Sequence, residues 1–131
     1  MLDFEKQLSG DVLIEKVNLV RATFVEASIM KKRLLDDINL SKKKIIVDIS
    51  KCDFIDSSFL GALVISLKRT RETGGVIKLV TASFTGGIIN LAGYQRIFEN
   101  YLSVEDALNS FRPTSRILQF ELANHRDIVS I

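Results

Sequence analysis

The sequence has few of the residues on which disulfide bonds, metal sites and thiol chemistry depend. Among its 131 residues there is one cysteine, Cys52, and one histidine, His125. A single cysteine excludes a disulfide within the chain, and one cysteine with one histidine excludes a zinc site in practice. Cys52 also has no nearby histidine that would activate it as a nucleophile. We therefore expect no metal site, and we predict that Cys52 is a small, partly buried residue.

Long hydrophobic runs are also missing. The longest, at residues 59–67, is too short to span a bilayer and is interrupted by Gly61 and Ser66. The first ten residues mix polar and apolar side chains and do not resemble a signal peptide. A net charge of +2 with 26% charged residues gives no sign of a surface for nucleic acid or for a membrane. These features predict a cytoplasmic protein with no membrane insertion and no nucleic-acid partner.

The patterns of nucleotide-binding and hydrolytic sites are absent too. Gly86 and Gly87 precede an apolar segment, but the Lys-Ser/Thr of a P-loop and the G-x-G-x-x-G spacing of a dinucleotide site are missing. The glycine pair is better explained as a turn that leads into a helix. The sequence also supplies no evident Ser-His-Asp set. A small nucleotide-binding or hydrolytic α/β domain is therefore the weakest interpretation, and we expect no cofactor, no catalytic residue and no enzymatic activity.

What is present is the pattern of one domain with a mixed sheet. A hydrophobic content of 47% is enough for a core, and the periodicity predicts the order β-β-α-β-α-β-α-β-α. In the first helix we expect Ala22, Val25 and Ile29 to face the core, with Leu34, Leu35 and Ile38 continuing the same face. The predicted elements are strands at 2–8 and 11–17, a helix at 21–38, a strand at 44–49, a helix from 57 to the Gly74-Gly75 pair, a strand at 76–81, a short helix at 83–93, a strand within 94–101 and a helix at 103–111.

The most informative stretch is the strand at 44–49 with the loop and helix that follow it. Asp56 directly precedes an apolar pattern of helical spacing and is a good N-cap residue. Ser57 and Ser58 then fall in the first helical turn, where backbone amides lack partners and the helix dipole is positive. A hydroxyl at this position is well placed to carry a phosphate group.

This stretch resembles the STAS domain, the fold of bacterial anti-sigma-factor antagonists. The residues that carry the resemblance are IIVDIS, then CDFIDSSFLGALV, then RETGGVIKLV. The pattern runs from about residue 11 to 111 and includes SVEDAL at 103–108. The resemblance implies an α/β fold with a mixed sheet of about four to five strands covered by about four helices. It also implies a STAS domain at residues 1–111 and a C-terminal extension of unknown role at 112–131.

The resemblance further implies a partner-switching role in signal transduction and transcription regulation. The unphosphorylated protein would bind an anti-sigma factor that is also a serine kinase, which frees the sigma factor. The kinase would phosphorylate the hydroxyl directly after Asp56, which is Ser57, with Ser58 as the alternative. A metal-dependent serine phosphatase would then restore the unphosphorylated form.

We expect the partner to contact Asp56, Ser57 and Ser58, with Ile55 and Phe59 as an apolar rim around them. Phe59 stands where the family usually has glycine, so it would place a large side chain beside the site. The main alternative is a STAS subunit of another assembly, such as a stress-signalling scaffold or a lipid-transport complex, without serine phosphorylation. The sequence leaves open whether the chain self-associates.

Two further segments carry less information. The apolar spacing within residues 112–131 fits a strand and a helix equally, and we expect this extension to pack on its own domain or on a partner subunit. Lys68, Arg69 and Arg71 are expected to form an exposed face of the central helix, too far along it to reach a phosphate on Ser57.

Overall fold

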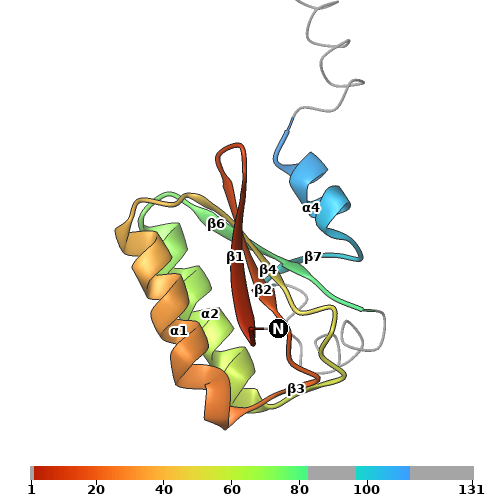
Figure 1. Cartoon of the computed structure of the whole chain (residues 1–131). Helices are drawn as coiled ribbons and strands as arrows, with labels where there is room; N and C mark the ends of the chain where they lie inside the picture. Colours follow the sequence, from red (N-terminus) through yellow and green to blue (C-terminus); the bar gives the residue numbers. More distant parts are fainter. Residues whose placement is uncertain (1, 83–96, 113–131) are drawn as a thin grey trace, which may run out of the picture.

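A computed structural model describes residues 2–82 and 97–112 of the chain (Figure 1). The helix expected at 83–93 lies outside these residues, as does nearly all of the extension at 112–131. The division of the chain at residue 111 therefore stays a prediction. Three helices are described, α1, α2 and α4, and the order of the described strands and helices agrees with the predicted mixed α/β fold.

The strands form a five-stranded sheet in the order β1-β2-β4-β6-β7. β1 runs antiparallel to β2, and the other neighbouring pairs are parallel, so the predicted opening hairpin and mixed sheet are confirmed. The five strands are β1 (Phe4–Ser9), β2 (Val12–Val17), β4 (Lys44–Asp48), β6 (Val76–Val80) and β7 (Glu99–Tyr101).

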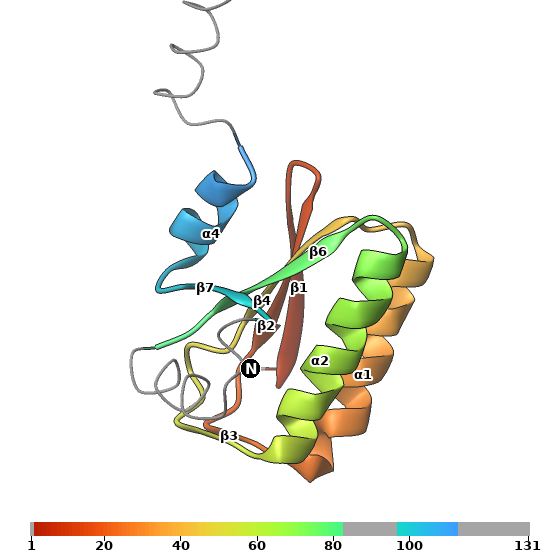
Figure 2. The same ribbon diagram turned by 180° about the vertical axis from the view of Figure 1, so that it is seen from behind.

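Helices cover both faces of this sheet. α1 (Phe24–Asn39) and α2 (Ser57–Glu72) lie side by side on one face, and the short α4 (Val104–Ser110) lies on the other (Figures 1 and 2). Successive side chains of β4 point to opposite faces of the sheet. Ile45 packs in the core under α1 and α2, and Ile46 packs in the cluster beside α4. A strand buried on both faces needs a continuous apolar run, which explains the composition of the predicted central strand.

The start of α1 differs from the prediction. The helix begins at Phe24, because Thr23 caps it and forms a capping box with Glu26. The two residues before this cap form a short strand, β3 (Arg21–Ala22), which pairs with β5 (Phe54–Ile55). A helix expected from residue 21 was therefore too long at its start.

The inward face of α1 was assigned correctly in its second half and wrongly in its first. Leu34 and Ile38 are buried as expected, and Met30 is buried with them. Val25 is 60% exposed and Ile29 is 49% exposed, so these two residues face solvent. The predicted stripe was counted from Ala22, which is buried but lies in β3 and not in the helix. Counting from a residue outside the helix gave the wrong rotation about the helix axis for the first turns of α1.

A cluster of four charged residues, two of them buried, joins α1 to the opening hairpin. Glu15 on β2 and Asp37 on α1 are both fully buried. The Arg33 guanidinium donates to Glu15 Oε1 at 2.7 Å, and Lys6 Nζ donates to Asp37 Oδ1 at 2.7 Å. The other oxygens, Glu15 Oε2 and Asp37 Oδ2, are buried without a hydrogen-bond donor among the described residues. Burial and the neighbouring Asp37 carboxyl raise the pKa of Glu15 to about 7, against the opposing effect of Arg33.

Candidate functional site

The candidate site lies where α1 and α2 both begin, beside the short β3 and β5 strands (Figure 1). Asp56 organises this end of the molecule. Its Oδ1 atom accepts a hydrogen bond from the Phe59 amide at 2.9 Å, which is the predicted N-cap of α2. Its Oδ2 atom accepts from the Phe24 amide at 2.8 Å, the first residue of α1. One carboxylate therefore satisfies amides at the start of two helices.

Ser57 and Ser58 lie at the start of α2, as the sequence predicts. Ser57 is the first residue of the helix, and both serines are exposed. The hydroxyls therefore stand at the positive end of the helix dipole, with solvent access and without a role in the core.

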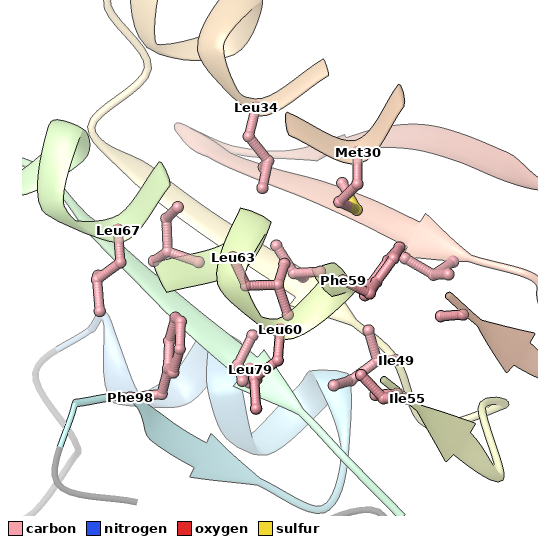
Figure 3. Packing of buried hydrophobic residues seen from close by; sticks show 14 of the residues in the cluster. Met30, Leu34, Ile49, Ile55, Phe59, Leu60, Leu63, Leu67, Leu79 and Phe98 are labelled. Atoms are coloured by element: carbon pink, nitrogen blue, oxygen red, sulfur yellow. The ribbon is translucent and has the colours of Figure 1, made fainter. Parts of the chain in front are cut away.

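Ile55 and Phe59 do not form the expected apolar rim. The Phe59 side chain is fully buried and Ile55 is 6% exposed, so neither offers a surface to a partner. Figure 3 shows the Phe59 ring among Met30, Ile49 and Ile55. Phe59 precedes Leu63 by four residues, and this spacing places both on the buried face of α2. Phe59, which stands where the family usually has glycine, thus adds to the core and contributes nothing to the surface beside Ser57.

Apolar residues other than Ile55 and Phe59 surround the site. Three exposed side chains, which we call the apolar rim, lie directly before β3, on β5 and at the start of α1: Val20 at 63% exposure, Phe54 at 38% and Phe24 at 71%. The Phe54 amide donates to Val20 O at 3.3 Å, and the Arg21 guanidinium lies 4.1 Å from the centre of the Phe54 ring. The rim is tied to the serines through the hydrogen bond between Phe24 and Asp56.

The sequence interpretation missed this apolar rim. Phe24 was placed inside a helix that was expected to begin at residue 21, and the pairing of β3 with β5 joins residues more than thirty positions apart. A local signal was present for the helix start. Thr23 followed three residues later by Glu26 is a capping-box pattern, and it sets the first helical residue at Phe24.

Cys52 lies close to this region in sequence but is chemically inert. The residue is fully buried, as a structural cysteine would be. Burial raises the pKa of its thiol to about 12, and the carboxylates of Asp48, Asp53 and Glu26 act in the same direction. The thiol is therefore protonated at neutral pH and is not a nucleophile.

Within residues 2–82 and 97–112, no three histidine, cysteine, aspartate or glutamate side chains come together in a way that would hold a metal ion. In the same part of the chain, every helix is too short or too polar to cross a bilayer.

Comparison with known proteins identifies relatives of this fold. The sequence model of the STAS domain matches residues 9–107. A solved structure of a proposed anti-sigma factor antagonist from Thermotoga maritima is similar, with 27% sequence identity and a TM-score of 0.74. The match covers 82% of this chain and 92% of the Thermotoga chain. No curated protein matches the sequence significantly.

Two more distant structures share the fold. One is the Bacillus cell fate determinant SpoIIAA in its phosphorylated form, with 13% identity and a TM-score of 0.64, covering 83% of this chain and 99% of that one. The other is the murine Solute Carrier 26 family member A9 anion transporter, with 20% identity and a TM-score of 0.65. That match covers 78% of this chain but 18% of the transporter. At such identities these two likenesses concern the fold alone.

Proposed function

Because the chain belongs to the STAS domain family, we propose that it is an anti-sigma factor antagonist whose binding is controlled by phosphorylation. In this proposal the unphosphorylated protein binds an anti-sigma factor with serine kinase activity, which frees the sigma factor. The kinase phosphorylates Ser57 and ends the association, and a metal-dependent serine phosphatase reverses the modification. The protein itself acts as a cytoplasmic binding partner and not as an enzyme.

The observation that carries this proposal is the position of Ser57. It is the exposed first residue of α2, directly after the Asp56 cap. A phosphate at this position lies near first-turn amides and the positive end of the helix dipole, so the fold accepts it with little rearrangement. Modification then changes the surface that a partner meets while the scaffold stays the same.

Electrostatics supplies the reason for release. A phosphoserine carries a charge of about −1.5 to −2 and adds three acceptor oxygens. In a close interface those oxygens would be desolvated beside the Asp56 carboxylate, which lies one residue away. Unpaired or like-charge contacts of this kind cost several kcal/mol, and each 1.4 kcal/mol lowers affinity about tenfold. Phosphorylation therefore acts as an off signal in this account.

The apolar rim gives the partner a surface to bind while the hydroxyl is neutral. Val20, Phe24 and Phe54 are exposed, and aromatic side chains are favoured in the buried centres of interfaces. Asp56, Ser57 and Ser58 complete the proposed footprint. The rim and the serines lie at one end of the molecule, so a single partner surface can contact both.

The direct test is phosphorylation by the cognate kinase with ATP, followed by mass spectrometry. We expect one phosphate on Ser57, no modification of Ser57→Ala, and normal modification of the matched control Ser58→Ala. Phosphate on another residue, or a Ser57→Ala protein that is still modified and released, would contradict the proposal.

A second candidate is a STAS subunit of another assembly, such as a stress-signalling scaffold or a lipid-transport complex, in which the serine is never modified. The fold likeness to part of an anion transporter is the observation in its favour. Affinity purification from native cells separates the two. A kinase as the co-purified partner supports the first candidate, and a transporter or a scaffold supports the second.

A further inference from the structure

The solvent side of the helix layer contains a groove that the proposed function does not use. It lies between α1 and α2, which run next to each other along one face of the sheet (Figures 1 and 2), and has a volume of about 380 Å³. Six residues line it: Lys31, Leu35, Ile65, Lys68, Arg69 and Glu72.

The groove combines apolar side chains with positively charged residues at its edges. Leu35 is half-buried and Ile65 is 49% exposed, so each keeps apolar surface in contact with water. Lys31 and Lys68 are exposed, and neither forms a salt bridge with any residue that the structure describes. Arg69 approaches Glu72 at 3.8 Å, which leaves the lining with an excess of positive charge.

Helical spacing shows which neighbouring residues share the face of each helix that lines the groove. Residues three, four or seven positions apart share one face of a helix, and this rule places two stripes on either side of the groove. The α1 stripe is Ser28, Lys31 and Leu35, and the α2 stripe is Gly61, Ile65, Lys68 and Glu72. Eleven residues of helix rise about 16 Å, so the surface is long enough for about three turns of a third helix.

Gly61, one turn before Ile65 on α2, keeps one end of this surface open. A Cβ atom built on Gly61 would have no neighbouring atom within 4 Å. No side chain projects from α2 at this position, and an approaching helix therefore meets main chain beside the apolar side chain of Ile65. Small residues of this kind let two helices approach closely.

We propose that the groove binds an amphipathic helix of a partner protein, one with an apolar stripe flanked by acidic residues. The apolar stripe covers Leu35 and Ile65, and the acids pair with Lys31 and Lys68 in a helix-in-groove arrangement. A basic helix would be repelled by the positive charges of Lys31 and Lys68, and the apolar lining does not suit nucleic acid. This proposal is independent of whether Ser57 is phosphorylated, since its contacts lie along the helices.

The test uses a capped fifteen-residue helical peptide made of Leu, Ala and Glu, with Leu on one stripe and Glu beside it. In a titration of the ¹⁵N-labelled full chain, we expect amide shifts centred on Leu35 and Ile65. Lys31→Glu combined with Lys68→Glu should weaken binding by roughly tenfold or more, since attraction becomes repulsion at two contacts. The matched control is Lys32→Glu, which makes the same charge change on α1 at the residue that pairs with Asp36; it should change the affinity by less than about twofold.

A second variant tests the shape of the groove apart from its charge. Gly61→Leu adds a side chain where there is open space, so we expect it to fold normally and to weaken peptide binding by roughly tenfold or more. The proposal is overturned if the acidic peptide does not bind at millimolar concentration. It is also overturned if the shifts centre elsewhere, if a peptide with Lys in place of Glu binds as well, or if the groove variants bind normally.

Discussion

The carboxylate of Asp56 accepts a hydrogen bond from the main-chain amide of Phe24 at 2.8 Å, although the two residues are 32 positions apart. The same carboxylate caps α2 through the amide of Phe59. This arrangement fixes the starts of α1 and α2 relative to each other. It also places the exposed Phe24 beside the exposed Ser57, so the apolar and the modifiable parts of the proposed interface depend on one side chain.

Replacing Asp56 should therefore cost more than removing an ordinary helix cap. Asp56→Ala leaves two helix-start amides without their acceptor, and we expect the free energy of unfolding to fall by about 2 to 3 kcal/mol. Thr23→Ala, which removes the cap of α1 alone, should cost about 1 kcal/mol. Urea denaturation of the two variants measures both. Equal losses would mean that the hydrogen bond to Phe24 contributes nothing.

Phe24 and Phe59 should separate binding from stability. Phe24 is 71% exposed, so Phe24→Ser should change the free energy of unfolding by less than about 0.5 kcal/mol while weakening the kinase partner's binding. Phe59 is fully buried, and Phe59→Ala should cost about 3 to 5 kcal/mol of stability. Denaturation and titration calorimetry provide the two measurements. A Phe24→Ser protein that binds with unchanged affinity would exclude this residue from the interface.

Local signals explain how much of this site was predictable from sequence. The start of α2 was predicted because Asp56, the two serines and the apolar spacing after them are adjacent in the chain. The apolar rim was not, because it requires β3 to pair with β5 across the chain and α1 to begin after its cap. Phe59 was misplaced for a different reason, since a first-turn residue faces either core or solvent according to how the helix packs.

The charged cluster shows a similar limit. The sequence gives no indication that Glu15 and Asp37 are buried together, because Glu15 lies in a strand and Asp37 near the end of a helix. Both acids become buried only when α1 packs on the hairpin. The central apolar strand, by contrast, was evident from its Ile and Val residues, since burial on both faces needs a continuous run.

Glu15 should make stability depend on pH. Its pKa is about 7 in the folded protein, against an ordinary value near 4.5. The folded state therefore holds a proton that the unfolded state releases first, and the contribution of Glu15 is fully present below pH 4.5 and lost as pH rises to about 7. The side chain introduced by Glu15→Gln is neutral at every pH, so this variant lacks the loss of stability between pH 4.5 and pH 7.

Urea denaturation of wild type and Glu15→Gln at several pH values checks this. The difference in the free energy of unfolding between variant and wild type should increase in favour of the variant from pH 4.5 to pH 7 and then level off. A difference that is constant over this range would show that Glu15 has the same proton affinity in both states. Titratable groups elsewhere in the protein contribute equally to the free energy of unfolding of wild type and of Glu15→Gln, so they cancel in the difference.

Two glycines should respond in opposite ways to the same substitution. Gly61 lies inside α2 with open space around it, so Gly61→Ala should raise the free energy of unfolding by about 0.5 to 1 kcal/mol. A Cβ atom at Gly75 would lie 2.7 Å from Lys43 O and 2.8 Å from Thr70 Cγ2, so Gly75→Ala should lower it. Thermal or urea denaturation measures both changes. A stabilising Gly75→Ala would contradict the close approach seen at this helix end.

The central claim is that a phosphate on Ser57 switches off a protein interface without disturbing the fold. The most direct measurement is the dissociation constant for the cognate kinase, by calorimetry, of the unmodified protein and of the protein phosphorylated at Ser57. Because unpaired or like-charge contacts of the phosphate cost several kcal/mol, we predict that phosphorylation weakens binding by roughly 100-fold or more. Ser57→Asp should also bind the kinase more weakly, and Ser57→Ala should bind it with unchanged affinity. Equal affinity of the two forms, with the phosphate confirmed on Ser57, would contradict the account.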